Sequence, residues 1–322
     1  MPPSEQTPDG YEIRPASADD AEVVAEIVNE VMVAETGVPW TTTEEQRDEL
    51  TSPGRDPGLV NVLLLERGGS AIGYVQFIAD AETPGPVTAF VHVRPHLWGL
   101  GLNAWLMRVS EERVRALSDL ERAVLRVARF ADNEPAERLF VALGYGLVRT
   151  FWMMRIALDS PPPVARVPEG IAIRTFEPGR DELPTYTALA EAFAEHWGGP
   201  FGSFEEWRHL HVDGDGSGFD PSLWFLATDG DEVVGSARCL ERSPRSDDTA
   251  EVAELAVRRP WRRRGIGLAL LHSAFGEFHR RGIPLAELGV DAENATGATR
   301  LYERAGMHVA FSWEFWEKQL FD

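Results

Sequence analysis

Residues 262–269 read Arg-Arg-Arg-Gly-Ile-Gly-Leu-Ala, and they decide how the second half of the chain folds. The preceding residues, 249–257, alternate between apolar and polar side chains, which predicts a strand. Apolar residues recur at helical spacing over 268–280, which predicts a helix after the glycines. Where glycines join a strand to a helix, backbone N–H groups and the positive helix N-terminus favour a bound phosphate. The stretch therefore indicates a strand–loop–helix that holds a phosphorylated ligand, and its arginines add charge-assisted donors.

Two other interpretations of this loop stay open. The loop lacks the Gly-Lys-Ser/Thr of a P-loop and the third glycine of a dinucleotide-binding motif, so a solvated basic turn fits it equally well. A nucleic-acid contact is the third interpretation. However, 31 Lys and Arg residues stand against 52 Asp and Glu residues, which gives a formal net charge of −21. Such a chain is repelled by phosphate backbones and by anionic lipid surfaces.

Landmarks of the second half recur in the first half at a spacing of 160 to 166 residues. They are Tyr11–Arg14 with Ile171–Arg174, Gly73 with Gly235, Gly101 with Gly267, and Gly144 with Gly306. This order indicates a duplicated domain, because the period is too long for a solenoid. We expect a first domain over residues 1–158, a proline-rich linker over 159–169 and a second domain over 170–322. A chain of 322 residues suits two domains of about 150 residues each.

Both copies predict the same order of strands and helices. In the second copy we expect strands at 171–174, 223–228, 232–240, 249–257, 285–290 and 310–317, and helices at 182–194, 204–211, 268–280 and 297–305. In the first copy we expect a hairpin around Gly68 and Gly69, strands at 88–93 and 123–129, and helices at 102–117 and 135–143. Short strands stand on both sides of each central helix. The fold class is therefore α/β (an α+β mixed sheet), in which each domain has a mixed, partly antiparallel sheet with helices on both faces.

The composition also limits where the protein works and what it binds. One cysteine, Cys239, excludes an internal disulfide and a thiolate zinc cluster, and suits a reducing cytoplasm. The N-terminal sequence lacks the basic and apolar stretches of a signal peptide, and no apolar run approaches the roughly 20 residues of a membrane helix. We expect a cytoplasmic protein, monomeric or homodimeric, with no metal, nucleic-acid or membrane partner.

The order of elements in the second copy is similar to that of a known family. A strand at 253–257, the Arg-x-x-Gly-x-Gly loop, a helix, a strand that ends at Asn294 and a helix over 299–306 resemble the GNAT superfamily of acyl-CoA N-acyltransferases. The likeness covers essentially all of the second copy and, more loosely, the first. The tandem arrangement, together with the segments 192–197 and 220–224, is similar to the mycothiol-synthase-like branch.

The resemblance implies that the second copy binds acetyl-CoA. In the family this loop wraps the coenzyme A pyrophosphate, while the preceding strand and an asparagine bind pantetheine and the acetyl carbonyl. The corresponding residues here are Arg262, Arg263, Arg264, Gly265, Ile266, Gly267 and Leu268 in the loop, Leu255, Ala256 and Val257 on the strand, and Asn294. From Asn294 to Tyr302 this chain has one residue more than the family's Asn-x-x-Ala-x-x-Leu-Tyr pattern.

Candidates for proton transfer are one tyrosine and two glutamates. A phenol with a reference pKa near 10 stays protonated at neutral pH and can donate to a departing thiolate. The family places Tyr302 beside the sulfur, although packing in an apolar helix is the other interpretation. Glu254 and Glu251 are candidate general bases, and their spacing of three predicts opposite faces of the strand. We favour Glu254 and keep Glu251 as the second choice, and either could be a surface charge.

The aromatic residues His196, Trp197 and Trp207 lie in the region that borders the acceptor site in the family. An aromatic wall can hold an amine through cation–π contacts, or it can close the hydrophobic core. His209 and His211 are two residues apart on a predicted helix, so they face different directions and form a poor metal pair.

The first copy departs from the family pattern at the reacting groups. Its loop, 96–101, keeps the glycines without the arginines, and Phe140 occupies the position of the tyrosine. We expect a non-catalytic domain there, and its binding of CoA stays open.

The expected function is an acetyl-CoA-dependent N-acetyltransferase whose C-terminal domain acetylates a primary amine by direct attack in a ternary complex. Its partner is then a small-molecule or peptide amine. The alternatives are a non-catalytic CoA-binding or regulatory module, a mycothiol-synthase-type enzyme, and a peptide or protein N-acetyltransferase.

Overall fold

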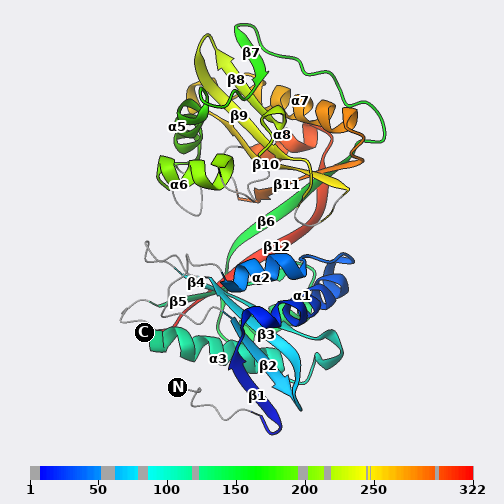
Figure 1. Ribbon diagram of the computed structural model, residues 1–322, viewed down its shortest axis with the longest axis vertical. Coiled ribbons are helices and arrows are strands. Elements are labelled where there is room, and N and C mark those ends of the chain that lie inside the picture. Colours follow the sequence, from blue (N-terminus) through cyan, green and yellow to red (C-terminus); the bar gives the residue numbers. More distant parts are fainter. Residues whose placement is uncertain are drawn as a thin grey trace. The chain divides into compact units, whose positions relative to one another are not determined.

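The computed structural model describes residues 8–51, 62–78, 86–117, 123–194, 202–213, 219–243, 246, 248–293 and 297–321. The chain forms two compact units. Unit 1 contains the residues up to Phe151 together with the C-terminal segment from Phe311, and unit 2 runs from Trp152 to Ala310. Figure 1 traces the helices and strands of each unit.

Unit 1 is built on a mixed sheet with the strand order β1-β2-β3-β4-β5-β12-β6. Its strands are β1 (Tyr11–Pro15), β2 (Val62–Arg67), β3 (Ser70–Ile78), β4 (Val87–Val93), β5 (Val124–Phe130), β6 (Gly146–Ala157) and β12 (His308–Gln319). Its helices are α1 (Ala21–Thr36), α2 (Thr43–Thr51), α3 (Leu102–Leu117) and α4 (Glu134–Ala142). The strands from β1 to β4 pair antiparallel, and β4 pairs parallel with β5.

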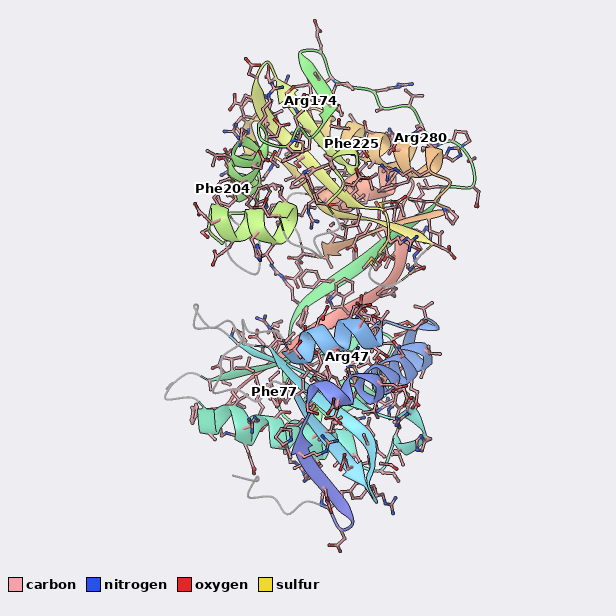
Figure 2. All side chains as sticks on the ribbon, viewed as in Figure 1. Arg47, Phe77, Arg174, Phe204, Phe225 and Arg280 are labelled. Atoms are coloured by element: carbon pink, nitrogen blue, oxygen red, sulfur yellow. The ribbon has the colours of Figure 1, made fainter. Side chains whose placement is uncertain are left out.

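Alternating side chains of this sheet enter two cores, one on each face. On β2, Leu63 and Leu65 pack with α3 and α4, while Val62 and Leu64 pack with α1. Phe77 of β3, labelled in Figure 2, belongs to the core on the α3 side. Successive residues of a strand point to opposite faces, so continuous apolar runs such as this one fit a sheet that is covered on both sides.

Unit 2 repeats the plan with the strand order β6-β11-β10-β9-β8-β7. Its further strands are β7 (Ile171–Thr175), β8 (Trp224–Asp229), β9 (Glu232–Leu240), β10 (Thr249–Val257) and β11 (Leu285–Asp291). Its helices are α5 (Glu182–Phe193), α6 (Phe204–Arg208), α7 (Ile266–Arg280) and α8 (Ala298–Arg304). Side chains of α7 and α8 pack on one face of the sheet, and those of α5 and α6 pack on the other.

The repeated Ile-Arg landmark joins the first strand of each unit to its first helix. Arg14 Nη2 lies 2.7 Å from Asp20 Oδ1, and Arg174 Nη2 lies 2.7 Å from Asp181 Oδ1. Arg174 is labelled in Figure 2. The hydrogen bonds from Arg14 hold the pKa of Asp20 well below its usual range. The duplication therefore includes an ion pair that both copies use in the same place.

The predicted α/β fold class, with its mixed sheets and helices on both faces, is confirmed. The strand 249–257 and the helix 102–117 have the predicted bounds. The helix predicted over 204–211 ends at Arg208, and the chain continues as a π-helical turn over His209–Asp213. The segment 159–169 contains no helix or strand and belongs to unit 2.

The last strand lies in a different place from the one that the sequence order suggests. We assigned 310–317 to the second domain, but Trp313–Gln319 pairs antiparallel with β5 and lies in unit 1. Conversely, Met154 and Leu158, at the end of the first copy, are buried in the core of unit 2. Each unit therefore takes a strand from the other half of the sequence.

A buried carboxylate holds the C-terminal strand in unit 1. Glu111 of α3 is 5% exposed, and Lys318 Nζ donates to its two carboxylate oxygens at 2.8 and 2.9 Å. The Tyr145 hydroxyl donates to the same carboxylate at 3.1 Å, and Arg115 does so at 3.3 Å. Burial raises the pKa of Tyr145, and the neighbouring Glu111 charge raises it further, so the phenol stays a donor.

We predict that Lys318→Met lowers the local stability of α3 and β12. Removing one partner of a buried ion pair costs about 3–5 kcal/mol. Here we expect about 2 kcal/mol, because Arg115 and Tyr145 still bond to Glu111. Hydrogen exchange of the α3 and β12 amides measures the loss. The control is Arg138→Ala, which removes an exposed ion pair with Glu134 and should change stability by less than about 0.5 kcal/mol. Equal protection in Lys318→Met and the parent chain would contradict the prediction.

Candidate active site

Two neighbouring strands of unit 2 separate part-way along their length. β10 and β11 pair in parallel only where Thr249–Glu251 faces Leu285–Glu287. Both strands then continue, β10 to Val257 and β11 to Asp291. Their backbone groups beyond this point are free of each other, so a ligand can hydrogen-bond to them.

A β-bulge marks the point where the strands separate. The pairing of β10 with β9 shifts between Val252 and Glu254, because Ala253 is one residue in excess. A bulged strand bends and twists more strongly at the extra residue. The bulge therefore adds a bend to β10 at the place where β10 leaves β11.

The bulge also corrects our expectation for the two glutamates. Glu251 pairs with Leu240 and Glu254 pairs with Arg238, and these partners are two residues apart on β9. Paired residues share a face of the sheet, so Glu251 and Glu254 lie on the same face. The prediction of opposite faces was wrong because it assumed unbroken alternation.

The glycine loop enters α7 through left-handed backbone. Gly265, the N-cap residue of α7, has φ 91°. Arg263 has φ 63°, the only positive value at a non-glycine residue in the described part of the chain. Left-handed backbone costs energy at a non-glycine residue such as Arg263, and alternation of this kind orients N–H groups toward a common point. A Cβ at Gly267 would lie 2.9 Å from Leu301 of α8, so this glycine permits close packing of the two helices.

The three loop arginines have two different environments. Arg262 Nε donates to the Val257 carbonyl at 2.9 Å, and its Nη2 donates to the Ala192 carbonyl at 3.0 Å. Arg262 therefore ties the loop to the ends of β10 and α5. Arg263 and Arg264 are exposed at the N-terminus of α7, where they are accessible to an anion.

The predicted strand and loop residues have side chains that pack inside the unit. Leu255, Val257, Ile266 and Leu268 contact the core on the α7 side, and Ala256 lies in the core on the α5 side. A ligand would meet their backbone rather than their side chains. Asn294, His196 and Trp197 lie outside the described residues.

Tyr302 lies on α8 with its ring in the core beside β10 and β11. It is 7% exposed, and burial raises the pKa of Tyr302 to about 12. Its hydroxyl has no hydrogen-bond partner within the described part of unit 2. The side chain is thus a protonated donor throughout the neutral range, and it also packs, as the second interpretation held.

Glu254 faces an arginine and a histidine that the sequence analysis missed. Its Oε1 lies 3.4 Å from Arg238 Nη2 and 3.5 Å from His211 Nε2. Its Oε2 is buried without a hydrogen-bond partner among the described residues. Burial lowers the pKa of His211, so the imidazole is neutral at pH 7. The signal for Arg238 was a charged residue inside an apolar strand. His211 was missed because the π-helical turn, and not a regular helix, sets the direction of its side chain.

Trp207 closes the core behind these groups. It is 2% exposed, its ring lies 5.7 Å from that of His211, and it packs with Trp224 and Leu189. The indole ring packs in this core, and its Nε1 is buried without a hydrogen-bond partner among the described residues.

Unit 1 repeats the divergence without a glutamate or a tyrosine at the equivalent positions. β4 pairs with β5 only from Val87 to Ala89, and a cavity of about 820 Å³ opens where the strands separate. The pairing of β4 with β3 is continuous, so β4 has no bulge. Counted from the equivalent Gly73 and Gly235, Phe90 stands at the position of Glu254, and Phe140 stands at that of Tyr302.

Diverging strands followed by a glycine loop and a helix, present twice, agree with the family comparison. The model of the acetyltransferase (GNAT) family matches residues 25–145 and 186–307. The chain belongs to the GNAT acetyltransferase family. It is an acyltransferase, and the GNAT family uses acetyl-CoA.

The similarity to known proteins covers almost the whole chain. A mycothiol acetyltransferase of Streptomyces coelicolor is 30% identical over 310 residues, which cover 91% of this chain and 94% of that protein. A GCN5-related N-acetyltransferase from Sphaerobacter thermophilus has a crystal structure with TM-score 0.82 and 34% identity, covering 98% of both chains. A tandem GNAT protein from the clavulanic acid biosynthesis pathway has TM-score 0.70 at 16% identity, covering 97% of this chain and 99% of that one, and it shares the fold. No helix in the described ranges is long and apolar enough to cross a membrane.

We predict that Gly265→Val abolishes the thermal stabilisation of the chain by acetyl-CoA. A β-branched residue is strained at φ 91°, and its side chain would occupy the space beside the helix N-terminus. The measurement is the shift in melting temperature with added acetyl-CoA. The control is Gly282→Val, which places the same strain, at φ 77°, beyond the other end of α7 and should keep the shift. A full shift in Gly265→Val would place the coenzyme elsewhere.

Proposed function

We propose that the chain is an acetyl-CoA-dependent N-acetyltransferase in which unit 2 transfers the acetyl group to a primary amine. One observation carries the proposal. Within the described residues, only unit 2 has, beside its diverging strands, both a carboxylate with a buried, unpaired oxygen, Glu254, and a buried protonated phenol, Tyr302 of α8. Unit 1 has phenylalanine at both positions. We therefore propose that unit 1 is non-catalytic.

Coenzyme A binding in this proposal uses charge at one end and backbone at the other. Arg263 and Arg264, with the N-terminus of α7, neutralise the pyrophosphate. The free backbone groups of Leu255–Val257 hydrogen-bond to pantetheine, which places the thioester beside β10. Asn294 is the proposed further contact to pantetheine. Arg262 acts indirectly, because its hydrogen bonds to the carbonyls of Val257 and Ala192 hold the loop.

The reaction is a direct attack in the ternary complex. The amine nitrogen forms a bond to the thioester carbonyl carbon, and the carbon–sulfur bond breaks. Glu254 takes the proton that the amine loses, and Tyr302 gives a proton to the departing thiolate. Glu251 shares the face of Glu254 and is the second candidate for the base. The described residues offer no nucleophile in a suitable setting, since burial raises the pKa of the Cys239 thiol far above neutrality.

A mycothiol-type acceptor is a second, more specific candidate. Relatives named mycothiol acetyltransferase are 30% and 32% identical to this chain over 91% and 92% of its length. Their coverage of both units favours a small-molecule amine over a peptide or protein amine.

We predict that Tyr302→Phe lowers kcat by about 10²–10⁴-fold, the usual contribution of general acid catalysis. The ring and its packing stay, so the KM for acetyl-CoA should barely change. Thiol release with an amine panel measures both constants. Because the pKa of Tyr302 is about 12, this group should cause no alkaline fall in kcat below about pH 11. Phe140→Tyr is the matched control and should create no activity. An unchanged kcat in Tyr302→Phe would leave the tyrosine a packing role alone.

A second prediction separates the two candidate bases. Glu254→Gln keeps the shape of the side chain but removes its proton acceptor, so kcat should fall by about 10²–10⁴-fold. Glu251→Gln is the matched substitution on the same face and should change kcat by less than about threefold. The reverse pattern would transfer the role of the base to Glu251.

A further inference from the structure

Three neighbouring side chains of unit 2 each have a buried polar atom without a hydrogen-bond partner. The atoms are Glu254 Oε2, Arg238 Nε and Trp207 Nε1, as judged among the residues that the structure describes. Buried polar groups are nearly always paired in folded proteins, so each exception requires an explanation. Three exceptions in side chains linked through Glu254 and His211 indicate a site that is completed by a ligand.

The opposite charges of Arg238 and Glu254 balance, but each side chain still has a buried polar atom without a hydrogen-bond partner among the described residues. Arg238 and Glu254 are 13% and 12% exposed and lie 3.4 Å apart, while His211 is neutral at pH 7. A guanidinium has five N–H donors, and this contact engages a single amino group of it. A purely cationic amine would meet Arg238 as well as Glu254, and the arginine would repel it. A ligand that carries both charges would satisfy both side chains.

We infer that the acceptor is an amine with an anionic oxygen group beside it, as in an α-amino acid, and that Arg238 is the residue that selects for that group. The inference rests on the proposed function, in which Glu254 meets the amine. Arg238 binds the carboxylate of the acceptor while Glu254 binds the ammonium. Glu254 takes one proton to leave the neutral amine and releases it to water, and it then takes the second proton as the amide forms.

The dimensions of an α-amino acid suit this pair of side chains. Standard bond lengths and angles place its nitrogen about 2.5 Å from its carboxyl carbon. Arg238 Nη2 and Glu254 Oε1 are separated by 3.4 Å, so adjacent groups of one small molecule can reach both. Trp207 Nε1 is a further donor on the same side of the sheet. In unit 1 the equivalent positions hold Gln76 and Phe90, which lack this pair of charges.

The test compares binding within matched series of ligands. Each series has an amino acid, its amide and its decarboxylated amine: phenylalanine, phenylalaninamide and phenethylamine, and then alanine, alaninamide and ethylamine. Calorimetry with the full chain and coenzyme A, which has no acetyl group to transfer, gives the dissociation constants without turnover. We expect each amino acid to bind about tenfold or more tightly than its decarboxylated amine, with the amide between them.

Variants of Arg238 separate selection from simple charge compensation. Arg238→Gln should bring the ratio of dissociation constants close to one, and Arg238→Lys should keep part of it. Arg280→Gln, at an exposed arginine of α7, is the control and should keep the full ratio. If Arg238 only neutralises Glu254, then Arg238→Gln weakens all ligands of a series equally, and that result overturns the inference.

Three further outcomes also decide the matter. Equal binding within each series by the parent chain, or no binding of any ligand at millimolar concentration, overturns the inference. If the chain acetylates amines equally well with and without a carboxylate, that result also overturns the inference, although it supports the proposed function. A carboxylate preference in binding without any thiol release from acetyl-CoA supports the inference and contradicts the proposed function.

Discussion

The extra residue in β10 sets the geometry of unit 2. Because Ala253 has no partner on β9, the strand bends just after its pairing with β11 ends at Glu251. The same residue brings Glu251 and Glu254 to one face and places Glu254 opposite Arg238. The bulge thus places a charged group beside the opening between β10 and β11. Six residues, 252–257, separate the end of this pairing from the glycine loop at 258–265. The opening and the helix N-terminus therefore belong to one continuous segment.

The exchange of strands ties each unit to both halves of the sequence. β12 completes the sheet of unit 1 through its pairing with β5, and Glu111 binds Lys318 at the end of that strand. In unit 2, Arg155 of β6 donates to the buried Glu287 of β11 at 2.9 Å. A charge in each core is thereby neutralised by a residue distant in the sequence. Unit 1 is therefore not a contiguous half of the chain, although the duplication in the sequence suggests that it would be.

The sequence predicted the elements that depend on local residue patterns. It missed the features that depend on which strands and side chains pair across the fold. Periodicity located β10 and α3 because side chains that face a core repeat at the period of the element. It also showed a strand near residue 310, but the neighbour of a strand is a property of the whole sheet, so β12 was assigned to the wrong unit. The bulge could not be seen for the same reason, since it exists only relative to β9. Arg238 and His211 became site residues through those long-range contacts, and Arg262, expected at the pyrophosphate, instead bonds to backbone carbonyls.

The two units show which parts of the arrangement make a cavity and which supply chemistry. Unit 1 has diverging strands and a cavity of about 820 Å³, yet its β4 pairs continuously with β3. Divergence therefore does not require the bulge, whereas the placement of a carboxylate on that face does, because Phe90 occupies the unbulged equivalent. Phenyl rings at the positions of Glu254 and Tyr302 leave unit 1 without a proton donor or acceptor there. Since β12 closes unit 1 and begins directly after α8, the unit without these groups is still joined covalently to the helix that carries Tyr302.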